Sequence, residues 1–172
     1  MSVSRLKNYF WESLKIPSNA VSQEEFFAAQ IDAIRDSTHI IRFLGYDQAF
    51  FENEGTISEL EKALNGEGEG RASFPISITA LLPEEVKGGR IEYLANEYPS
   101  FKVIKTSKNL ENGFSVHDEF AVGIWDSTKE TVYGPEKGNG ICLRYLVEDV
   151  KIARQFIIIF ENDIKLLKKI EV

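Results

Sequence analysis

Apolar residues recur at helical spacing in five stretches of the chain. Leu6, Phe10 and Leu14 fall on one side of a predicted helix over residues 3–15, which Pro17 ends. The same spacing predicts four further helices, each with one apolar side. They cover residues 22–36, 56–66, 90–95 and 148–170.

Between these helices lie short runs rich in β-branched and aromatic residues, a composition typical of strands. The predicted strands cover residues 38–46, 73–82, 101–106, 113–126, 131–133 and 141–145. The early strands alternate with helices, which indicates parallel crossovers, whereas the late strands follow one another, which indicates an antiparallel edge. The predicted fold class is therefore α/β, with a mixed, mostly parallel sheet and helices on both faces.

The pattern contains no interior linker long enough to separate two domains. We therefore expect one α/β domain over residues 1–172, made of a helical N-terminal extension (1–21) and a core (22–170). The stretch GEGEGR at 66–71 predicts a mobile linker between a helix and a strand.

Charge and cysteine content restrict the setting and the partners. The chain has 20 lysines and arginines against 27 acidic residues, a net charge of −7, so we expect no general nucleic-acid binding. Cys142 is the single cysteine and cannot form an internal disulfide. The N-terminus lacks the apolar core of a secretory signal, and the apolar run Phe156–Phe160 is too short for a membrane span. These features predict a cytoplasmic protein.

Two segments invite a chemical interpretation. The glycine-rich stretch 134–140 matches no phosphate-binding loop, since a strand rather than a helix follows it, and a hairpin or a site-rim loop explains its glycines. His117, Asp118 and Glu119 lack further ligands at metal-binding spacing, so we expect no metal and no cofactor. A solvated strand face is the simplest interpretation of the two acids.

The segment around His117 resembles the phospholipase D-like superfamily. Its active signature is H-x-K-x-x-x-x-D, in which the histidine is the nucleophile, the lysine binds phosphate and the aspartate orients the histidine. In this chain His117 matches, but Glu119 replaces the lysine and Ile124 replaces the aspartate. The resemblance therefore implies the fold without the phosphodiesterase activity.

The wider resemblance covers roughly residues 22–168 and implies an αβ sandwich. It rests on STHIIRFLGYDQAFF, ISITALLPEE, YPSFKVIKTS, FSVHDEFAVGIWD and RYLVEDVKIARQFIIIFEN. The superfamily includes inactive sensor domains of transcriptional regulators, which use the cleft for ligands or the sheet edge for pairing.

The leading interpretation is a non-catalytic, regulatory module, a pseudoenzyme that senses a ligand or contacts a protein. The candidate ligand-binding residues are His117, Glu119, Lys137, Asn139 and Arg144, and His117 is the one catalytic candidate. The alternative is a diverged phosphodiesterase or nuclease with its site at a dimer interface, which needs a cation from Lys129, Lys137 or Arg144 beside His117. A third interpretation is a structural protein without a pocket.

The expected partners are a second copy of the chain and either another protein or a small ligand. The run Phe156–Phe160 covers every side of a helix, because successive residues turn by about 100°. One domain buries one side, so the other predicts a homodimer. The consecutive aromatic residues Tyr9, Phe10 and Trp11 favour the same conclusion.

Overall fold

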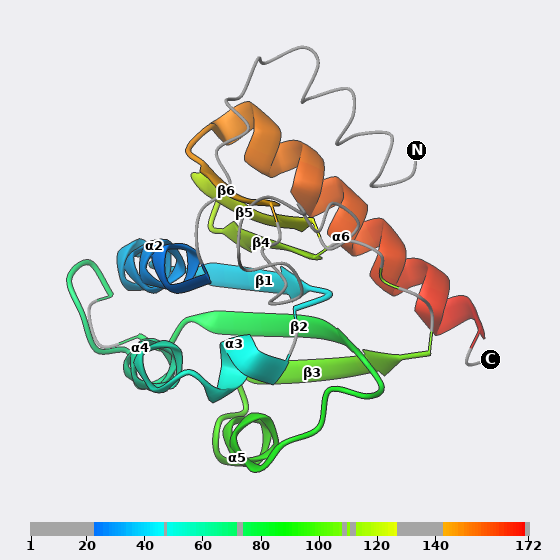
Figure 1. Cartoon of the computed structure of the whole chain (residues 1–172), viewed down its shortest axis with the longest axis horizontal. Coiled ribbons are helices and arrows are strands. Elements are labelled where there is room, and N and C mark those ends of the chain that lie inside the picture. Colours follow the sequence, from blue (N-terminus) through cyan, green and yellow to red (C-terminus); the bar gives the residue numbers. More distant parts are fainter. Residues whose placement is uncertain are drawn as a thin grey trace, which may run out of the picture.

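A six-stranded mixed sheet lies at the centre of the structure, with strand order β3-β2-β1-β4-β5-β6 (Figure 1). The computed structural model describes residues 23–46, 48–71, 74–107, 110, 113–126 and 143–170. The strands are β1 (Ile40–Leu44), β2 (Ser77–Pro83), β3 (Phe101–Thr106), β4 (Gly113–His117), β5 (Ala121–Asp126) and β6 (Leu143–Val147). The helices are α2 (Gln23–Asp36), α3 (Gln48–Glu52), α4 (Glu54–Leu64), α5 (Gly89–Glu97) and α6 (Val150–Ile170).

The pairing confirms the predicted mixed α/β sheet. β1 pairs with β2, and β2 with β3, in parallel, through crossovers that contain α3, α4 and α5. β4, β5 and β6 then add antiparallel strands beside β1. The predicted strand over 113–126 is in fact two strands, since a turn at Asp118–Phe120 reverses the chain. The predicted helix 3–15, the strand 131–133 and the glycine-rich stretch 134–140 lie outside the described residues.

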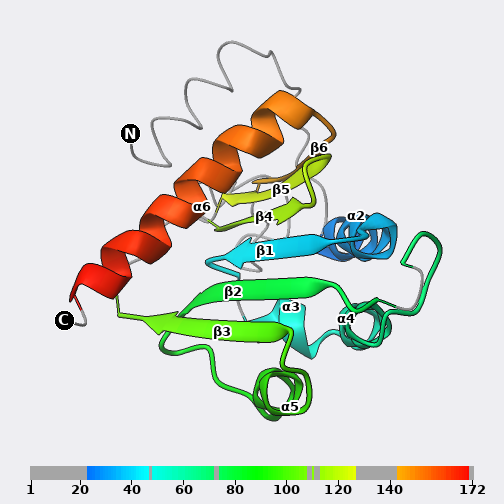
Figure 2. The same ribbon diagram turned by 180° about the vertical axis from the view of Figure 1, so that it is seen from behind.

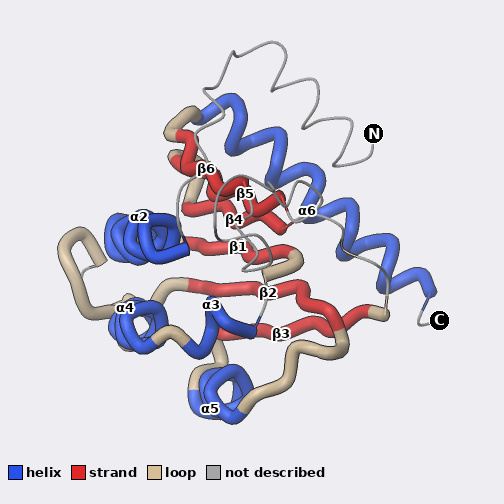
Figure 3. The backbone as a smooth tube through the Cα atoms, in the orientation of Figure 1, coloured by secondary structure: helices blue, strands red, loops and turns tan. Residues whose placement is uncertain are grey.

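Helices cover both faces of the sheet, and a separate core fills each side (Figures 2 and 3). Alternation along β1 sends Ile41 and Phe43 towards α2, α3, α4 and α5, and sends Leu44 towards α6. On the first side, Phe43, Tyr46, Phe50 and Phe51 form an aromatic cluster with ring centroids 4.7–5.5 Å apart.

Helix α6 crosses the second face diagonally, from β6 towards the end of β3 (Figure 2). Its buried residues are Ile152, Ala153, Phe156, Ile159 and Phe160. The ring of Phe156 meets that of Phe114 on β4, edge to face, with centroids 4.9 Å apart. Within the run Phe156–Phe160, Ile158 alone is exposed, and the other four residues belong to the core beneath α6 or pack against it. This run therefore does not by itself require a second chain. The homodimer stays a prediction.

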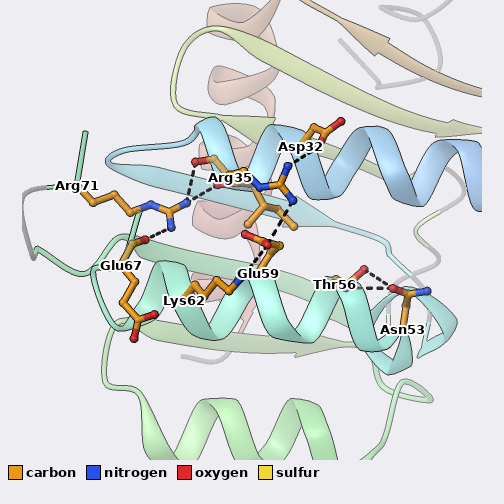
Figure 4. Close-up of polar contacts among 9 residues, drawn as sticks. Asp32, Arg35, Asn53, Thr56, Glu59, Lys62, Glu67 and Arg71 are labelled. Atoms are coloured by element: carbon orange, nitrogen blue, oxygen red, sulfur yellow. Dashed lines mark hydrogen bonds and ion pairs between the residues drawn. The ribbon is translucent and has the colours of Figure 1, made fainter. Parts of the chain in front are cut away.

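The segment 66–71, predicted as a mobile linker, ends in a buried arginine (Figure 4). The Arg71 guanidinium donates to the carbonyl oxygens of Ile34 (2.6 Å), Arg35 (3.1 Å) and Ser37 (3.0 Å), and also to that of Glu67. It thereby binds the carbonyls where α2 ends, of which that of Ile34 also accepts the Ser37 N–H at 3.2 Å. Burial lowers the pKa of Arg71 from its usual value, partly offset by Glu59 and Asp118. Composition alone missed this anchoring role.

Candidate functional site

His117, the residue that matches the signature, lies in a buried polar cluster at the end of β4. Its side chain is 0% exposed. Alternation along the strand places Ser115 on the same face, towards α2. The ring Nε2 is 3.0 Å from both Gln30 Oε1 and Ser115 Oγ, and Nδ1 is 3.4 Å from Ser37 Oγ. Both ring nitrogens therefore have partners inside the fold.

The partners of His117 are themselves linked. The Tyr46 hydroxyl donates to Ser115 Oγ at 3.0 Å, and the Ser115 hydroxyl donates to Gln30 Oε1 at 2.9 Å. Ser37 Oγ donates to the carbonyl oxygen of Ala33 in the last turn of α2 at 2.7 Å. Helix α2, strand β4 and the connections that follow α2 and β1 thus meet at one network. We call it the His117 cluster: Gln30, Ser37, Tyr46, Ser115 and His117.

Burial sets the protonation state of His117. It lowers the pKa of the imidazole to about 3, although the nearby charge of Asp118 acts in the opposite direction. The ring is therefore neutral at pH 7. Phe43 presents its ring at a T-shaped angle with centroids 6.2 Å apart, which adds to the low polarity. A neutral imidazole is the nucleophilic form, but a ring with no exposed surface cannot reach a phosphodiester without rearrangement of the fold.

Gly123 on β5 makes room for the cluster. It lies opposite Ser115 in the sheet, and a Cβ atom there would sit 1.8 Å from Gln30 Nε2 and 2.7 Å from Ser115 Oγ. Any side chain at this position would displace Gln30. The Gln30 amide nitrogen is buried and has no hydrogen-bond partner in the described part of the chain.

Asp118 ties the β4–β5 turn to the start of β1. Its backbone adopts a left-handed conformation with φ of 48°. One carboxylate oxygen accepts from the N–H groups of His39 (2.9 Å) and Ile40 (2.7 Å), and the other accepts from the N–H (2.8 Å) and hydroxyl (3.2 Å) of Thr38. A solvated strand face is therefore the wrong interpretation of Asp118. Its neighbour Glu119 is exposed and pairs with Arg154 Nε at 3.1 Å.

A pocket of about 360 Å³ opens beside this turn, between the start of β1 and α6. Arg42 lies on the α6 side of β1, opposite to Ile41 and Phe43, and its Nε is 3.5 Å from Glu161. The pocket therefore lies on the other side of the sheet from the His117 imidazole. Its walls are His39, Ile40, Arg42, Asp118, Glu119 and Ile157.

The structure separates the ligand-binding residues expected from the sequence. His117 is buried, whereas Glu119 is at the surface, although the two are close in the chain. Arg144 belongs to β6, with β5 between it and β4, and its side chain is outside the described part. Lys129, Lys137 and Asn139 also lie outside the described residues. Within the described part of the chain, no lysine or arginine side chain forms a hydrogen bond with His117.

Sequence reasoning missed the partners of His117. Ser115 could have been found from strand alternation, since it lies two residues before His117. Gln30 is a polar residue within α2, and Ser37 is the residue that follows this helix. Neither belongs to a recognisable sequence motif. Among the described residues, no group of three or more histidines, cysteines or carboxylates could hold a metal ion.

The comparisons with known proteins reveal a likeness of fold. No protein-family model matches the chain, and no curated protein matches its sequence. Solved structures do match, among them that of TrmBL2, an archaeal chromatin protein with a novel mode of DNA binding. That match has a TM-score of 0.54 at 12% identity, and it covers 94% of this chain and 61% of the TrmBL2 chain. NucT from Helicobacter pylori also matches (TM-score 0.55, 12% identity, 83% of this chain and 89% of NucT). The chain therefore spans about three fifths of the length of TrmBL2, and it shares an α/β fold with both proteins.

One expectation about partners is wrong. The net charge of the chain suggested that general nucleic-acid binding is excluded, yet a structure of similar fold belongs to a DNA-binding chromatin protein. The reason is physical, because net charge sums over the whole surface, whereas binding depends on the local potential.

Among the described residues, none of the helices has the length and apolar character that a membrane crossing requires.

Proposed function

We propose that this chain is a non-catalytic phospholipase D-like module, a regulatory pseudoenzyme that senses a small ligand or contacts a protein. The observation that carries this proposal is the environment of His117. Its imidazole is fully buried, and Gln30, Ser37 and Ser115 surround its nitrogens. A nucleophile must instead lie within reach of the atom that it attacks.

The charge at the lysine position supports the same proposal. Phosphoryl transfer requires a cation to bind the anionic centre, and Glu119 supplies a carboxylate there. The nearby Arg154 is paired with that carboxylate. The pocket beside Glu119 provides a concave surface of the size that small ligands occupy.

The proposal also includes the domain extent, the cellular setting and the ligand-binding residues expected from the sequence. We assign it one domain over residues 1–172, a cytoplasmic setting, and a ligand-binding set drawn from His117, Glu119, Lys137, Asn139 and Arg144. In this set, His117 acts indirectly, by holding α2 against β4, since its own surface is covered.

The test is an assay with a chromogenic phosphodiester and with single-stranded DNA, using the wild type, His117→Ala and Glu119→Lys. We expect no turnover from any of the three. Glu119→Lys restores the lysine of the signature, yet the imidazole stays buried, so activity should not return. Turnover by the wild type that disappears in His117→Ala would overturn the proposal.

A second candidate is a diverged phosphodiesterase or nuclease with its site at a dimer interface. One observation favours it: a DNA-binding chromatin protein has a similar fold. This candidate requires DNA cleavage that depends on His117 and rises more steeply than linearly with protein concentration. DNA binding in a gel-shift assay without cleavage would instead support a binding module whose ligand is nucleic acid.

A further inference from the structure

The pocket between β1 and α6 contains charges of both signs and an apolar wall. Arg42 provides a cation, Asp118 and Glu119 provide carboxylates, and Ile40 and Ile157 provide apolar surface. Ile40 is 37% exposed although it belongs to a central strand. A volume of about 360 Å³ is at the low end for ligand sites, so the pocket suits a small molecule.

Arg42 has hydrogen-bonding capacity to spare. Its side chain is only 14% exposed, and in the described part of the chain its partner is Glu161, which meets Nε at the long distance of 3.5 Å. A guanidinium carries five N–H donors in a fixed fork, and the two terminal nitrogens of Arg42 make no hydrogen bond with described residues. A planar carboxylate is the acceptor that fits such a fork in a bidentate manner.

The two carboxylates in the wall are not equivalent. Both oxygens of Asp118 are occupied by the backbone N–H groups and the hydroxyl at 38–40, so this residue is committed to the fold. Glu119 is exposed and meets Arg154 through one oxygen, and an exposed pair of this kind is weak. Glu119 is therefore the carboxylate that is available to a cationic group of a ligand.

This combination disfavours a ligand with a single kind of charge. A multiply charged anion such as a phosphate would face Asp118 and Glu119, and a simple cation would face Arg42. A molecule with one charge of each sign matches both sides at once. The apolar wall requires that such a molecule also carry an aliphatic or aromatic side chain.

We propose that this pocket binds a free apolar α-amino acid. The carboxylate meets the terminal nitrogens of Arg42, the ammonium group meets Glu119, and the side chain lies against Ile40 and Ile157. This inference rests on the proposed non-catalytic binding function and names its ligand class.

Isothermal titration calorimetry tests the inference with leucine, valine, methionine and phenylalanine as probes. At least one of the four should bind to the wild type. Analogues of that amino acid without the ammonium or without the carboxylate (for leucine, 4-methylpentanoate and isoamylamine) should bind about tenfold more weakly or worse, because each loses a charge-assisted contact. Arg42→Gln and Glu119→Gln should weaken binding to a similar extent. Arg90→Gln is the matched control, since it removes an exposed ion pair, with Glu54, that is not part of the pocket.

Absence of binding by all four amino acids would overturn the inference, as would an ammonium-free analogue that binds as tightly as its parent. Because Glu119 is exposed, its replacement keeps the test valid even if Arg42→Gln fails to fold. The phosphodiester assay reports separately on the proposed function. Amino-acid binding together with turnover that depends on His117 would remove the non-catalytic proposal alone, whereas no binding and no turnover would remove only the ligand assignment.

Discussion

Acid should destabilise this fold through His117. Folding holds the imidazole neutral, with its pKa lowered to about 3, whereas an unfolded chain binds a proton near the ordinary value of 6.5. Below pH 6.5 the unfolded state therefore carries a proton that the folded state does not. Stability contributed by this group is complete above pH 6.5 and declines as the pH falls towards 3, where the folded protein also becomes protonated.

The size of the effect follows from the two pKa values. Each pH unit between them costs about 1.4 kcal/mol in the free energy of unfolding. At pH 4.5, two units below the unfolded value of 6.5, the loss is about 3 kcal/mol. Typical domains have only about 5–15 kcal/mol of stability in total, so a loss of this size is easily measured.

Urea unfolding of the wild type and of His117→Gln at pH 7.0 and pH 4.5 measures this contribution. Carboxylates also contribute to acid destabilisation: for Glu59, burial acts to raise the pKa, but Lys62 and Arg35 outweigh it and leave the pKa lowered in the folded protein. Their contribution is present in both proteins, so it cancels in the difference between them. His39→Gln is the matched control, because it removes the histidine that the fold leaves exposed.

The wild type should lose about 3 kcal/mol more than His117→Gln between the two pH values, and His39→Gln should behave like the wild type. Equal losses in the wild type and His117→Gln would refute the reasoning. An NMR titration in which the His117 ring protons shift with a midpoint near pH 6.5 would refute it too.

The remaining predictions concern other contacts. Arg71→Lys should lower the free energy of unfolding by about 2 kcal/mol in urea titrations, because an ammonium group has three N–H donors for the four carbonyls that Arg71 binds; a change below about 0.5 kcal/mol would contradict this role. Gly123→Ala should cost about 2 kcal/mol through its clash with Gln30, and adding Gln30→Ala should recover part of that loss; a neutral Gly123→Ala would refute the packing. Deleting residues 148–172 should give an unfolded or insoluble chain, because α6 provides half of one core, and a cooperative thermal transition near that of the parent would contradict this.

Periodicity was sufficient to predict the outline of the fold. The helical spacing of 148–170 and the alternation of helices and strands led to a mixed sheet covered on both faces, which the structure confirms. The turn at Asp118–Phe120 escaped prediction because no glycine or proline marks it. Asp118 adopts the left-handed conformation there, and its carboxylate bonds to residues about 80 positions earlier, which no local pattern reveals.

The site was harder to predict for the same reason. The sequence singled out His117, and it showed that Glu119 stands where the signature has a lysine. It could not show that Gln30 and Tyr46, from distant segments, meet Ser115 beside the imidazole, since such contacts arise only when the sheet and α2 pack. It also could not show the pocket at Arg42, because a central strand and the closing helix form it together.

Under the proposed non-catalytic function, burial and charge explain how the fold can keep a histidine at this position without its use as a nucleophile. A nucleophilic imidazole needs an open face towards the substrate and a cation beside the leaving oxygens. At the end of β4, alternation turns the ring of His117 inward, where Gln30 of α2 and Ser37, just after α2, cover it. In the turn that follows, Glu119 supplies a carboxylate rather than a cation, and it meets Arg154 at the surface. A change at Glu119 alone would leave the imidazole covered, so attack by His117 on a substrate would require α2 to move away from β4. The fold shared with TrmBL2 and NucT therefore does not decide the function of this chain, because function depends on the side chains that the fold exposes.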